Sequence, residues 1–235
     1  MLNIRQFRSD DLEALYRISL ATGLAGGDAS HLYADPRLMG HIYAAPYALL
    51  EPSLALVVED GEGVAGFAVG ATDTTAWEQR LEQVWWPSLR ERYVLPAEAD
   101  ASRWTHDQRR AFMIHRLTPT PPAVARSYPA HLHMNLLPRL HGRGVGTKLF
   151  DCWTSIANDR GAKAIHVAIN RANIGAVEFW RKMGFADLAL DGLPEGRTIW
   201  KGRCRSTGRT DGVDAAQVDS AQEYTGVIPN AVRDP

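Results

Sequence analysis

The sequence has few cysteines, and this scarcity limits what can hold the fold together. Its 235 residues include only two cysteines, Cys152 in a helical pattern and Cys204 near the C-terminus. Two cysteines cannot build the disulfide framework of a small secreted protein or a zinc site with four cysteine ligands. We therefore expect no metal site and a reducing, cytoplasmic location.

The chain also lacks an excess of either charge and any long apolar run. Its 26 Lys and Arg residues are balanced by 27 Asp and Glu residues, so the formal net charge is −1. Without an overall basic field, we expect neither nucleic acid nor an anionic membrane as a partner. No stretch reaches the roughly 18 apolar residues of a membrane span, and the charged N-terminal residues do not predict a signal peptide.

The sequence does contain alternating strand and helix patterns, which are typical of an α/β protein. The expected elements are, in order, a strand at 2–8, a helix from 12, a helix at 36–47, strands at 54–59 and 64–71, a helix at 75–93, a central strand from 131, a helix at 147–161, a strand at 163–170, a helix from 173 that ends at Gly184, and strands at 185–190 and 198–202. We predict one α/β sheet of about seven strands with helices on both faces.

Two segments differ in composition from these elements. Residues 95–129 are rich in proline around one short helical piece, which Thr105 and Gln108 can start with a capping box. So long a connection is more often a functional insert than a featureless linker, so we expect a flap over the site. The prediction is a domain at 1–203 that includes this 95–129 flap, followed by a polar tail at 204–235.

The stretch from His131 to Gly146 combines a strand, a glycine-rich turn and the start of a helix. Unpaired N–H groups and the positive end of the helix dipole make such a junction suitable for an anion. The spacing Gly142-x-Gly144-x-Gly146 fits neither the phosphate loop of nucleotide hydrolases nor the dinucleotide fingerprint GxGxxG. A glycine-rich turn alone is a weak signal, because many corners need glycine only to turn.

The run from His141 to Gly146 nevertheless resembles the RxxGxG or QxxGxG motif of the GNAT superfamily of acetyltransferases. Asn173, Ala176, Phe179 and Gly184-Phe185 are similar to the later helix of that family. The resemblance covers about residues 1–203 and implies the GNAT fold, with a mostly antiparallel sheet and a splayed central strand pair. It also implies acetyl-CoA as cosubstrate.

Within this superfamily, several segments resemble the C-terminal acetyltransferase-like domain of the eukaryotic O-GlcNAcase. They include YADPRLMGHIYAA, LALVVEDGEGVAGFAVGATD and WWPSLRERY. That domain lacks the glycine pattern of the turn, which this chain keeps. We therefore expect a free-standing, prokaryotic-type relative with a usable cofactor site.

The resemblance to the GNAT superfamily implies where the cofactor binds. Backbone N–H groups from Arg143 to Thr147 would surround the pyrophosphate, with Gly144 and Gly146 leaving room for it, and the backbone at the end of the central strand would pair with the pantetheine amides. His141 replaces the usual Arg or Gln, so we expect weaker pyrophosphate binding. The expected cofactor-binding residues are Leu136, Leu137, His141, Gly142, Arg143, Gly144, Val145, Gly146, Thr147, Asn173 and Trp180.

Acetyl transfer to an amine also needs a base, and the central strand offers candidates. His131, His133 and Asn135 share one face of the strand, so His133 is the first candidate and His131 the second. The alternative is that both histidines are hydrogen-bonded residues of the sheet. Asp73 could bind or deprotonate the amine, or it could simply cap a helix.

The sequence lacks the usual residue for the acid that protonates the leaving thiolate. Many GNAT enzymes use a Tyr directly after the helix Phe, and Trp180 occupies that position here. Tyr128 or a water molecule could replace it.

Three functions are compatible with these observations. The first is an acetyl-CoA-dependent N-acetyltransferase that acts, as a monomer or homodimer, on a small-molecule or protein amine. The second is an acyl-CoA-binding module without catalysis, which Trp180 and the lack of Asp or Glu on the central strand favour. The third is an interaction domain without ligand, and the GxGxG turn separates it from the first two.

Overall fold

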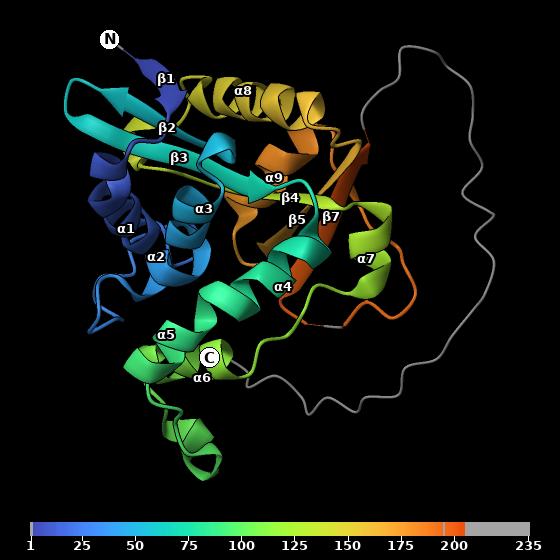
Figure 1. Ribbon diagram of the computed structural model, residues 1–235. Coiled ribbons are helices and arrows are strands. Elements are labelled where there is room, and N and C mark those ends of the chain that lie inside the picture. Colours follow the sequence, from blue (N-terminus) through green and yellow to red (C-terminus); the bar gives the residue numbers. More distant parts are fainter. Residues whose placement is uncertain (1, 195, 205–235) are drawn as a thin grey trace. The chain divides into compact units, whose positions relative to one another are not determined.

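A seven-stranded mixed sheet forms the centre of the computed structural model, which describes residues 2–194 and 196–204 (Figure 1). Across the sheet the strands are β1 (Asn3–Gln6), β2 (Ala55–Asp60), β3 (Gly63–Ala71), β4 (Ala130–Leu136), β5 (Ala164–Asn170), β7 (Thr198–Cys204) and β6 (Ala186–Asp187). Among the strands of the described residues, only β4 and β5 are parallel to each other. This confirms the predicted α/β class and the mostly antiparallel sheet; residues 205–235 of the predicted tail lie outside the described residues.

Helices pack on both faces of this sheet, as predicted. They are α1 (Leu12–Ala21), α2 (Leu38–Tyr43), α3 (Ala45–Leu50), α4 (Thr74–Val84), α5 (Trp86–Arg92), α6 (His106–His115), α7 (Pro122–Ser127), α8 (Val145–Asp159) and α9 (Ile174–Lys182). Within the described part of the chain, none of them is long and apolar enough to cross a membrane.

Alternation along the strands divides the core into two clusters. Val57 of β2 points to the cluster formed with α1 to α5, whereas its neighbours Leu56 and Val58 belong to the cluster under α8 and α9. Successive strand residues point to opposite faces, so a strand covered on both sides is apolar throughout. The buried run of β2 is therefore explained by helices above and below it (Figure 1).

Proline divides two helices that the sequence pattern predicts as continuous. The expected helix at 36–47 is α2 and α3, with Pro46 in the first turn of α3, and the expected helix at 75–93 is α4 and α5, with Pro87 in the first turn of α5. Proline lacks the N–H that would continue the preceding helix but fits a first turn. The break leaves Val84 56% exposed, whereas Trp86 lies in the interior with 5% exposure.

The segment at 95–129 is ordered around α6 and α7. The capping box of Thr105 and Gln108 is present: the threonine side chain accepts from the Gln108 N–H and the glutamine side chain accepts from the Thr105 N–H. Asn173 caps α9, and Gly184 follows the end of that helix with a φ of 82°. The strand expected at 185–190 is only Ala186–Asp187.

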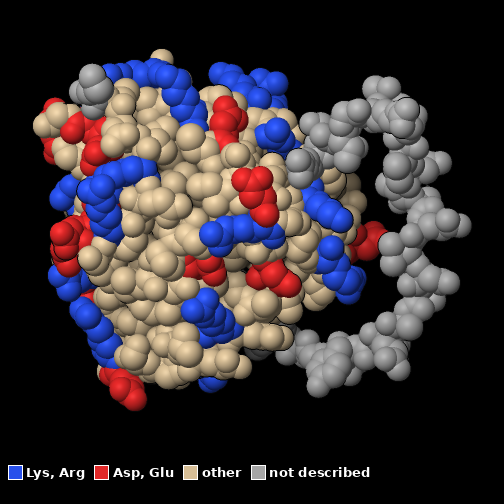
Figure 2. All heavy atoms as spheres, turned by 45° about the horizontal axis from the view of Figure 1, so that its top comes forward, with Lys and Arg blue, Asp and Glu red and all other residues tan. Residues whose placement is uncertain are grey.

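Charged side chains are mixed over the surface. On the face that Figure 2 shows, blue Lys and Arg side chains alternate with red Asp and Glu side chains, and neither sign covers a continuous region. This distribution agrees with the formal net charge of −1.

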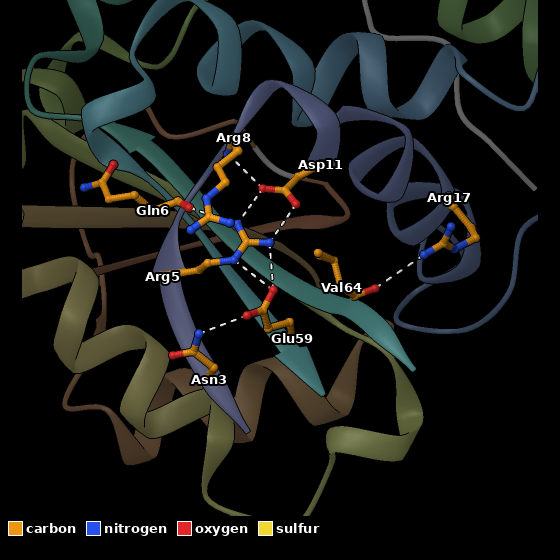
Figure 3. Close-up of polar contacts among 8 residues, drawn as sticks. All are labelled: Asn3, Arg5, Gln6, Arg8, Asp11, Arg17, Glu59 and Val64. Atoms are coloured by element: carbon orange, nitrogen blue, oxygen red, sulfur yellow. Dashed lines mark hydrogen bonds and ion pairs between the residues drawn. The ribbon is translucent and has the colours of Figure 1, made fainter. Parts of the chain in front are cut away.

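An ion-pair network attaches the edge strand β1 to the rest of the domain (Figure 3). Arg5 donates to both carboxylate oxygens of Asp11, at 2.7 and 2.9 Å, and its Nε donates to Glu59 of β2 at 2.8 Å. Asp11 also accepts from the Arg8 N–H, and its side chain is only 7% exposed. The hydrogen bonds from Arg5 lower the pKa of Asp11, so the carboxylate is charged in the folded protein.

We predict that Asp11→Asn lowers the free energy of unfolding by about 2 to 3 kcal/mol, because it removes one partner of a nearly buried ion pair while Glu59 still neutralises Arg5. Urea unfolding followed by circular dichroism measures the change. Asp10→Asn is the matched control at the exposed neighbouring position, with an expected effect within about 0.5 kcal/mol. Equal effects of the two substitutions would contradict the role given to Asp11.

Candidate functional site

The parallel pair β4 and β5 separates after two residue pairs. Ala130 pairs with Ile165 and His131 with His166, and beyond them β4 continues only with β3 while β5 continues only with β7. Leu137 donates its N–H to the carbonyl of Ala65 in β3. In an antiparallel ladder every second residue bonds to the same neighbouring strand, so the backbone groups of Leu132, Met134 and Leu136 point away from β3 and toward the gap. The end of β4 is thus an open strand edge inside the domain.

The glycine-rich turn follows this open edge directly. Gly142 and Gly144 both have a φ of 70°, and a Cβ built on either would meet nothing within 4 Å. Gly144 is the N-cap of α8, and the first helical bond runs from the Lys148 N–H to the Gly144 carbonyl at 3.2 Å. The N–H groups of Val145, Gly146 and Thr147 therefore have no acceptor within the helix.

Gly146 has a packing role that the sequence does not suggest. We expected it to leave room for a pyrophosphate, but a Cβ there would lie 3.0 Å from Cε2 of Phe179 and 3.3 Å from Cδ1 of Leu136. The absent side chain permits the close approach of α8 to α9 and to the end of β4. Gly142 and Gly144, in contrast, allow the positive φ angles that the turn requires.

Cationic side chains surround the turn unevenly. Arg143 and Lys148 are exposed, whereas Arg139 is held by Asp60, whose carboxylate accepts from it at 2.8 and 3.2 Å. His141 donates from Nε2 to the carbonyl of Leu136 at 3.0 Å, so it braces the open edge of β4. Arg143 and Lys148 have no ion pair among the described residues, although Arg143 Nη1 donates to the Arg139 carbonyl at 3.4 Å.

A pocket of about 410 Å³ lies on the other side of the gap. Leu132 and Val167, the first residues beyond the paired part of β4 and β5, both line it, so it reaches the point where the strands separate. Its remaining lining residues are Ile42, Tyr43, Tyr47, Trp77, Glu78, Gln79, Leu81, Glu82, Trp86, Leu117, Thr118, Pro119, Thr120, His131, His133, His166, Ala168 and Trp200. Residues 117–120 come from the predicted flap.

A chain of hydrogen bonds connects three lining residues, Tyr47, His131 and His133, to the buried Thr74. Thr74 Oγ1 lies 2.7 Å from the carbonyl of Pro129 and 2.7 Å from Nδ1 of His131. The Tyr47 hydroxyl lies 2.8 Å from Nε2 of His131 and 3.2 Å from Nε2 of His133. Each hydroxyl has one proton, so these contacts order the protons along the chain.

The carbonyl of Pro129 can only accept a hydrogen bond, and this fixes which atom donates in every other bond of the chain. Thr74 donates to Pro129 and therefore accepts from Nδ1 of His131, whose Nε2 then accepts from the Tyr47 hydroxyl. The Tyr47 oxygen accepts in turn from Nε2 of His133. Nδ1 of His133 is left with its lone pair, which is the form that a base requires.

Burial keeps these imidazoles neutral. It lowers the pKa of His133 to about 4 and that of His131 well below 6.5, with neighbouring His166 acting in the same direction. Burial also lowers the pKa of His166, although Nδ1 of His166 donates to the Tyr128 carbonyl at 2.6 Å. Burial raises the pKa of Tyr47, which therefore remains a donor.

The other predicted catalytic residues lie outside this pocket. Asp73 is exposed and is the N-cap of α4, where its carboxylate accepts from the Ala76 N–H at 3.0 Å, in agreement with the capping alternative. The ring of Tyr128 lies against Gly202 of β7, where an added Cβ would come within 2.5 Å of it. Its hydroxyl faces the Cys204 thiol, and burial raises its pKa.

Two predicted cofactor contacts have clear structural roles. Trp180 is 7% exposed and packs edge-on against Phe150, Phe179 and Phe185 in the core, so it presents no acid to a ligand. The Asn173 side chain accepts from the Ala176 N–H at 3.0 Å as the cap of α9.

The sequence pattern did not identify Tyr47, Thr74, Glu78 or Trp200 as site residues. They come from three elements, α3, α4 and β7: Thr74 and Glu78 lie four residues apart on α4, but no spacing along the chain links these two to Tyr47 or Trp200. His166 could have been found, since it lies on the polar face of an alternating strand next to His131. Among the described residues, no group of three or more His, Cys, Asp or Glu side chains is arranged to hold a metal ion.

Comparisons with known proteins agree with this architecture. A sequence model described as the acetyltransferase (GNAT) family matches residues 13–185. Protein O-GlcNAcase of Rattus norvegicus and Mus musculus is 20% identical over 169 residues, which are 69% of this chain but only 18% of those proteins.

Solved structures are similar over most of the chain. The crystal structure of SsHAT is 34% identical, with a TM-score of 0.76 over 86% of this chain and 98% of that one. PH1933 from Pyrococcus horikoshii OT3 is 14% identical, with a TM-score of 0.53 over 87% of this chain and 99% of that one. PaiA N-acetyltransferase from Thermoplasma acidophilum, solved with coenzyme A, is 14% identical, with a TM-score of 0.50 over the same shares. The last two show likeness of fold alone.

We predict that the free energy of unfolding decreases as the pH is lowered from 6.5 to about 4. In this window the unfolded chain protonates His133 while the folded protein, with its pKa of about 4, does not. The protonation of His133 accounts for up to about 3 kcal/mol of this decrease in the free energy of unfolding. Urea unfolding at several pH values measures the slope, and His133→Gln, which does not titrate, is expected to flatten it. Identical slopes would contradict a partly buried His133 that is neutral in the folded protein.

Proposed function

Since the chain belongs to the GNAT acetyltransferase family, we propose that it transfers an acetyl group from acetyl-CoA to an amine that enters through the histidine-lined pocket. The observation that carries the proposal is the gap between β4 and β5. On one side it continues into the glycine-rich turn, and on the other it opens into a pocket with an available imidazole lone pair. Donor and acceptor could meet there.

The residues around the turn fit coenzyme A. Acetyl-CoA supplies the acetyl group as a thioester. The N–H groups of Val145, Gly146 and Thr147 would hold its pyrophosphate, with Arg143 and Lys148 supplying positive charge. The open edge of β4 would pair with the amides of its pantetheine arm, as an added strand does.

Among the candidate bases, the hydrogen-bond order favours His133. Nδ1 of His133 can take the proton that the attacking amine loses, whereas both nitrogens of His131 are already bonded to Thr74 and Tyr47. His131 is then a positioning residue. A pKa of about 4 makes His133 a weak base, so its contribution to the rate should lie at the low end for general bases.

Water is the best candidate for protonating the departing thiolate. Trp180 lies in the core, and Tyr128 faces Cys204 at the paired end of the strands, away from the gap. A thiol has a pKa of about 8.5, so the thiolate leaves readily without full protonation. A dedicated acid is therefore not required.

The alternative function is an acyl-CoA-binding module with little or no catalysis. Two observations favour it: the low pKa of His133, and the absence of Asp and Glu from β4. This alternative shares the cofactor site and differs only in turnover.

We predict that the wild-type protein releases free thiol from acetyl-CoA with a suitable amine, and that His133→Ala lowers kcat by about 100-fold, as expected for loss of a general base. Asp73→Asn is the control, because asparagine also caps a helix; kcat should not change. Tight binding of acetyl-CoA without release with any amine would instead establish the binding module. Loss of activity in Asp73→Asn alone would shift the base to Asp73.

We further predict that His141→Arg strengthens acetyl-CoA binding by about threefold, because it adds a screened positive charge beside the turn. Isothermal titration calorimetry measures the dissociation constant. Asp159→Asn changes the net charge by the same amount at the far end of α8 and should leave the constant unchanged. An equal gain in both variants would mean that only overall charge matters, and no gain in either would argue against the turn as the pyrophosphate site.

A further inference from the structure

We infer that the acceptor is a small primary amine with an aromatic body, of the arylalkylamine type, rather than a lysine of a protein or a polyamine. The inference rests on the proposed function, because it concerns the pocket through which the amine would enter. Three properties of the pocket carry it: the nature of its walls, its charge and its size.

The walls are unusually aromatic. Tyr43, Tyr47, Trp77, Trp86 and Trp200 all line the pocket. Tyr47 and Trp77 stack with ring centres 4.5 Å apart and an interplanar angle of 24°, and Trp200 packs against His166 at 5.7 Å. Flat rings on several sides match a flat apolar ligand, which gains contact area and ring–ring geometry. Aromatic faces also attract an ammonium group.

The charge of the lining selects for a cation. Glu78 and Glu82 are its only ionised residues among those that the structure describes, since no Lys or Arg lines the pocket and its histidines are held neutral. The two carboxylates differ. Glu82 is bound by Arg90, with Nη2 to Oε2 at 2.8 Å, whereas Glu78 accepts only from the backbone N–H of Thr120 at 2.9 Å. Glu78 is thus the uncompensated negative charge.

The size of the pocket separates a small molecule from a protein side chain. Its 410 Å³ falls within the roughly 300 to 1,000 Å³ of sites that enclose a whole small ligand. A single lysine side chain would fill only a fraction of that space. A polyamine would offer charge but no flat surface to the aromatic rings of the walls.

The first test compares acceptors by thiol release: phenethylamine, spermidine and a lysine-containing peptide. We expect kcat/KM for phenethylamine to exceed the other two at least about tenfold, a difference typical of a well-filled apolar site. A preference for the peptide or for spermidine would overturn the inference while leaving the proposed acetyltransferase in place.

The second test uses the two glutamates, which lie four residues apart on α4. Glu78→Gln keeps the acceptor for the Thr120 N–H and removes the charge, so it should raise KM for phenethylamine about fivefold, whereas Glu82→Gln should raise it less. Inhibition by 2-phenylethanol, which is neutral, should be the same in Glu78→Gln as in the wild type. A larger effect of Glu82→Gln, or equal weakening of 2-phenylethanol, would refute the role of Glu78.

Binding separates failure of this inference from failure of the proposed function. If no amine is acetylated, the quenching of tryptophan fluorescence by phenethylamine still reports on the pocket, since Trp77, Trp86 and Trp200 line it. Saturable binding that weakens in Glu78→Gln would support the amine site in a protein without turnover. Absence of saturable binding would overturn the inference whatever the turnover assays show.

Discussion

The early separation of β4 from β5 is the constraint on which the site depends. Had the two strands stayed paired, the backbone of Leu132, Met134 and Leu136 would bond to β5 and no gap would exist. Their separation leaves Leu132 and Met134 without a partner on β5 among the described residues, so an extended ligand could pair with their backbone, whereas the Leu136 carbonyl accepts from His141. It also places the turn at 141–146 at one end of the gap and the histidines of the pocket near the other.

The imidazoles of this apolar pocket are hydrogen-bonded, whereas the indole Nε1 atoms of Trp77 and Trp200 are buried without a hydrogen-bond partner among the described residues. Three imidazoles lie between aromatic rings and the sheet, where an unpaired polar atom would be costly. The carbonyls of Pro129 and Tyr128 settle the arrangement, because each can only accept: one fixes Thr74 and the other fixes His166. Two lone pairs without a partner among the described residues, on Nδ1 of His133 and on Nε2 of His166, are therefore a consequence of how the rest of the cluster is hydrogen-bonded.

Much of the fold could be predicted because its signals are local. Alternation along β4, the cap at Asn173 and the glycines at 142 and 144 each depend on residues close in sequence. The pocket could not be predicted in this way, since Tyr47 reaches the histidines only through the folding of α3 against the sheet. Gly146 shows the same limit: its spacing suggested a ligand, and its actual neighbour is Phe179 of another helix.

Trp180 shows how core packing and chemistry are linked in this domain. The aromatic group formed with Phe150, Phe179 and Phe185 fills the space under α8 and α9, and Phe179 also contacts the bare backbone of Gly146. A large apolar ring at 180 thus supports the helix that carries the turn, where a tyrosine would bring a buried hydroxyl in need of a partner. The residue that removes the family's usual acid is thereby part of what holds the proposed phosphate-binding turn in position. For the proposed acetyltransferase, Trp180 would therefore support the scaffold of the cofactor site without supplying an acid, so cofactor binding and turnover need not change together.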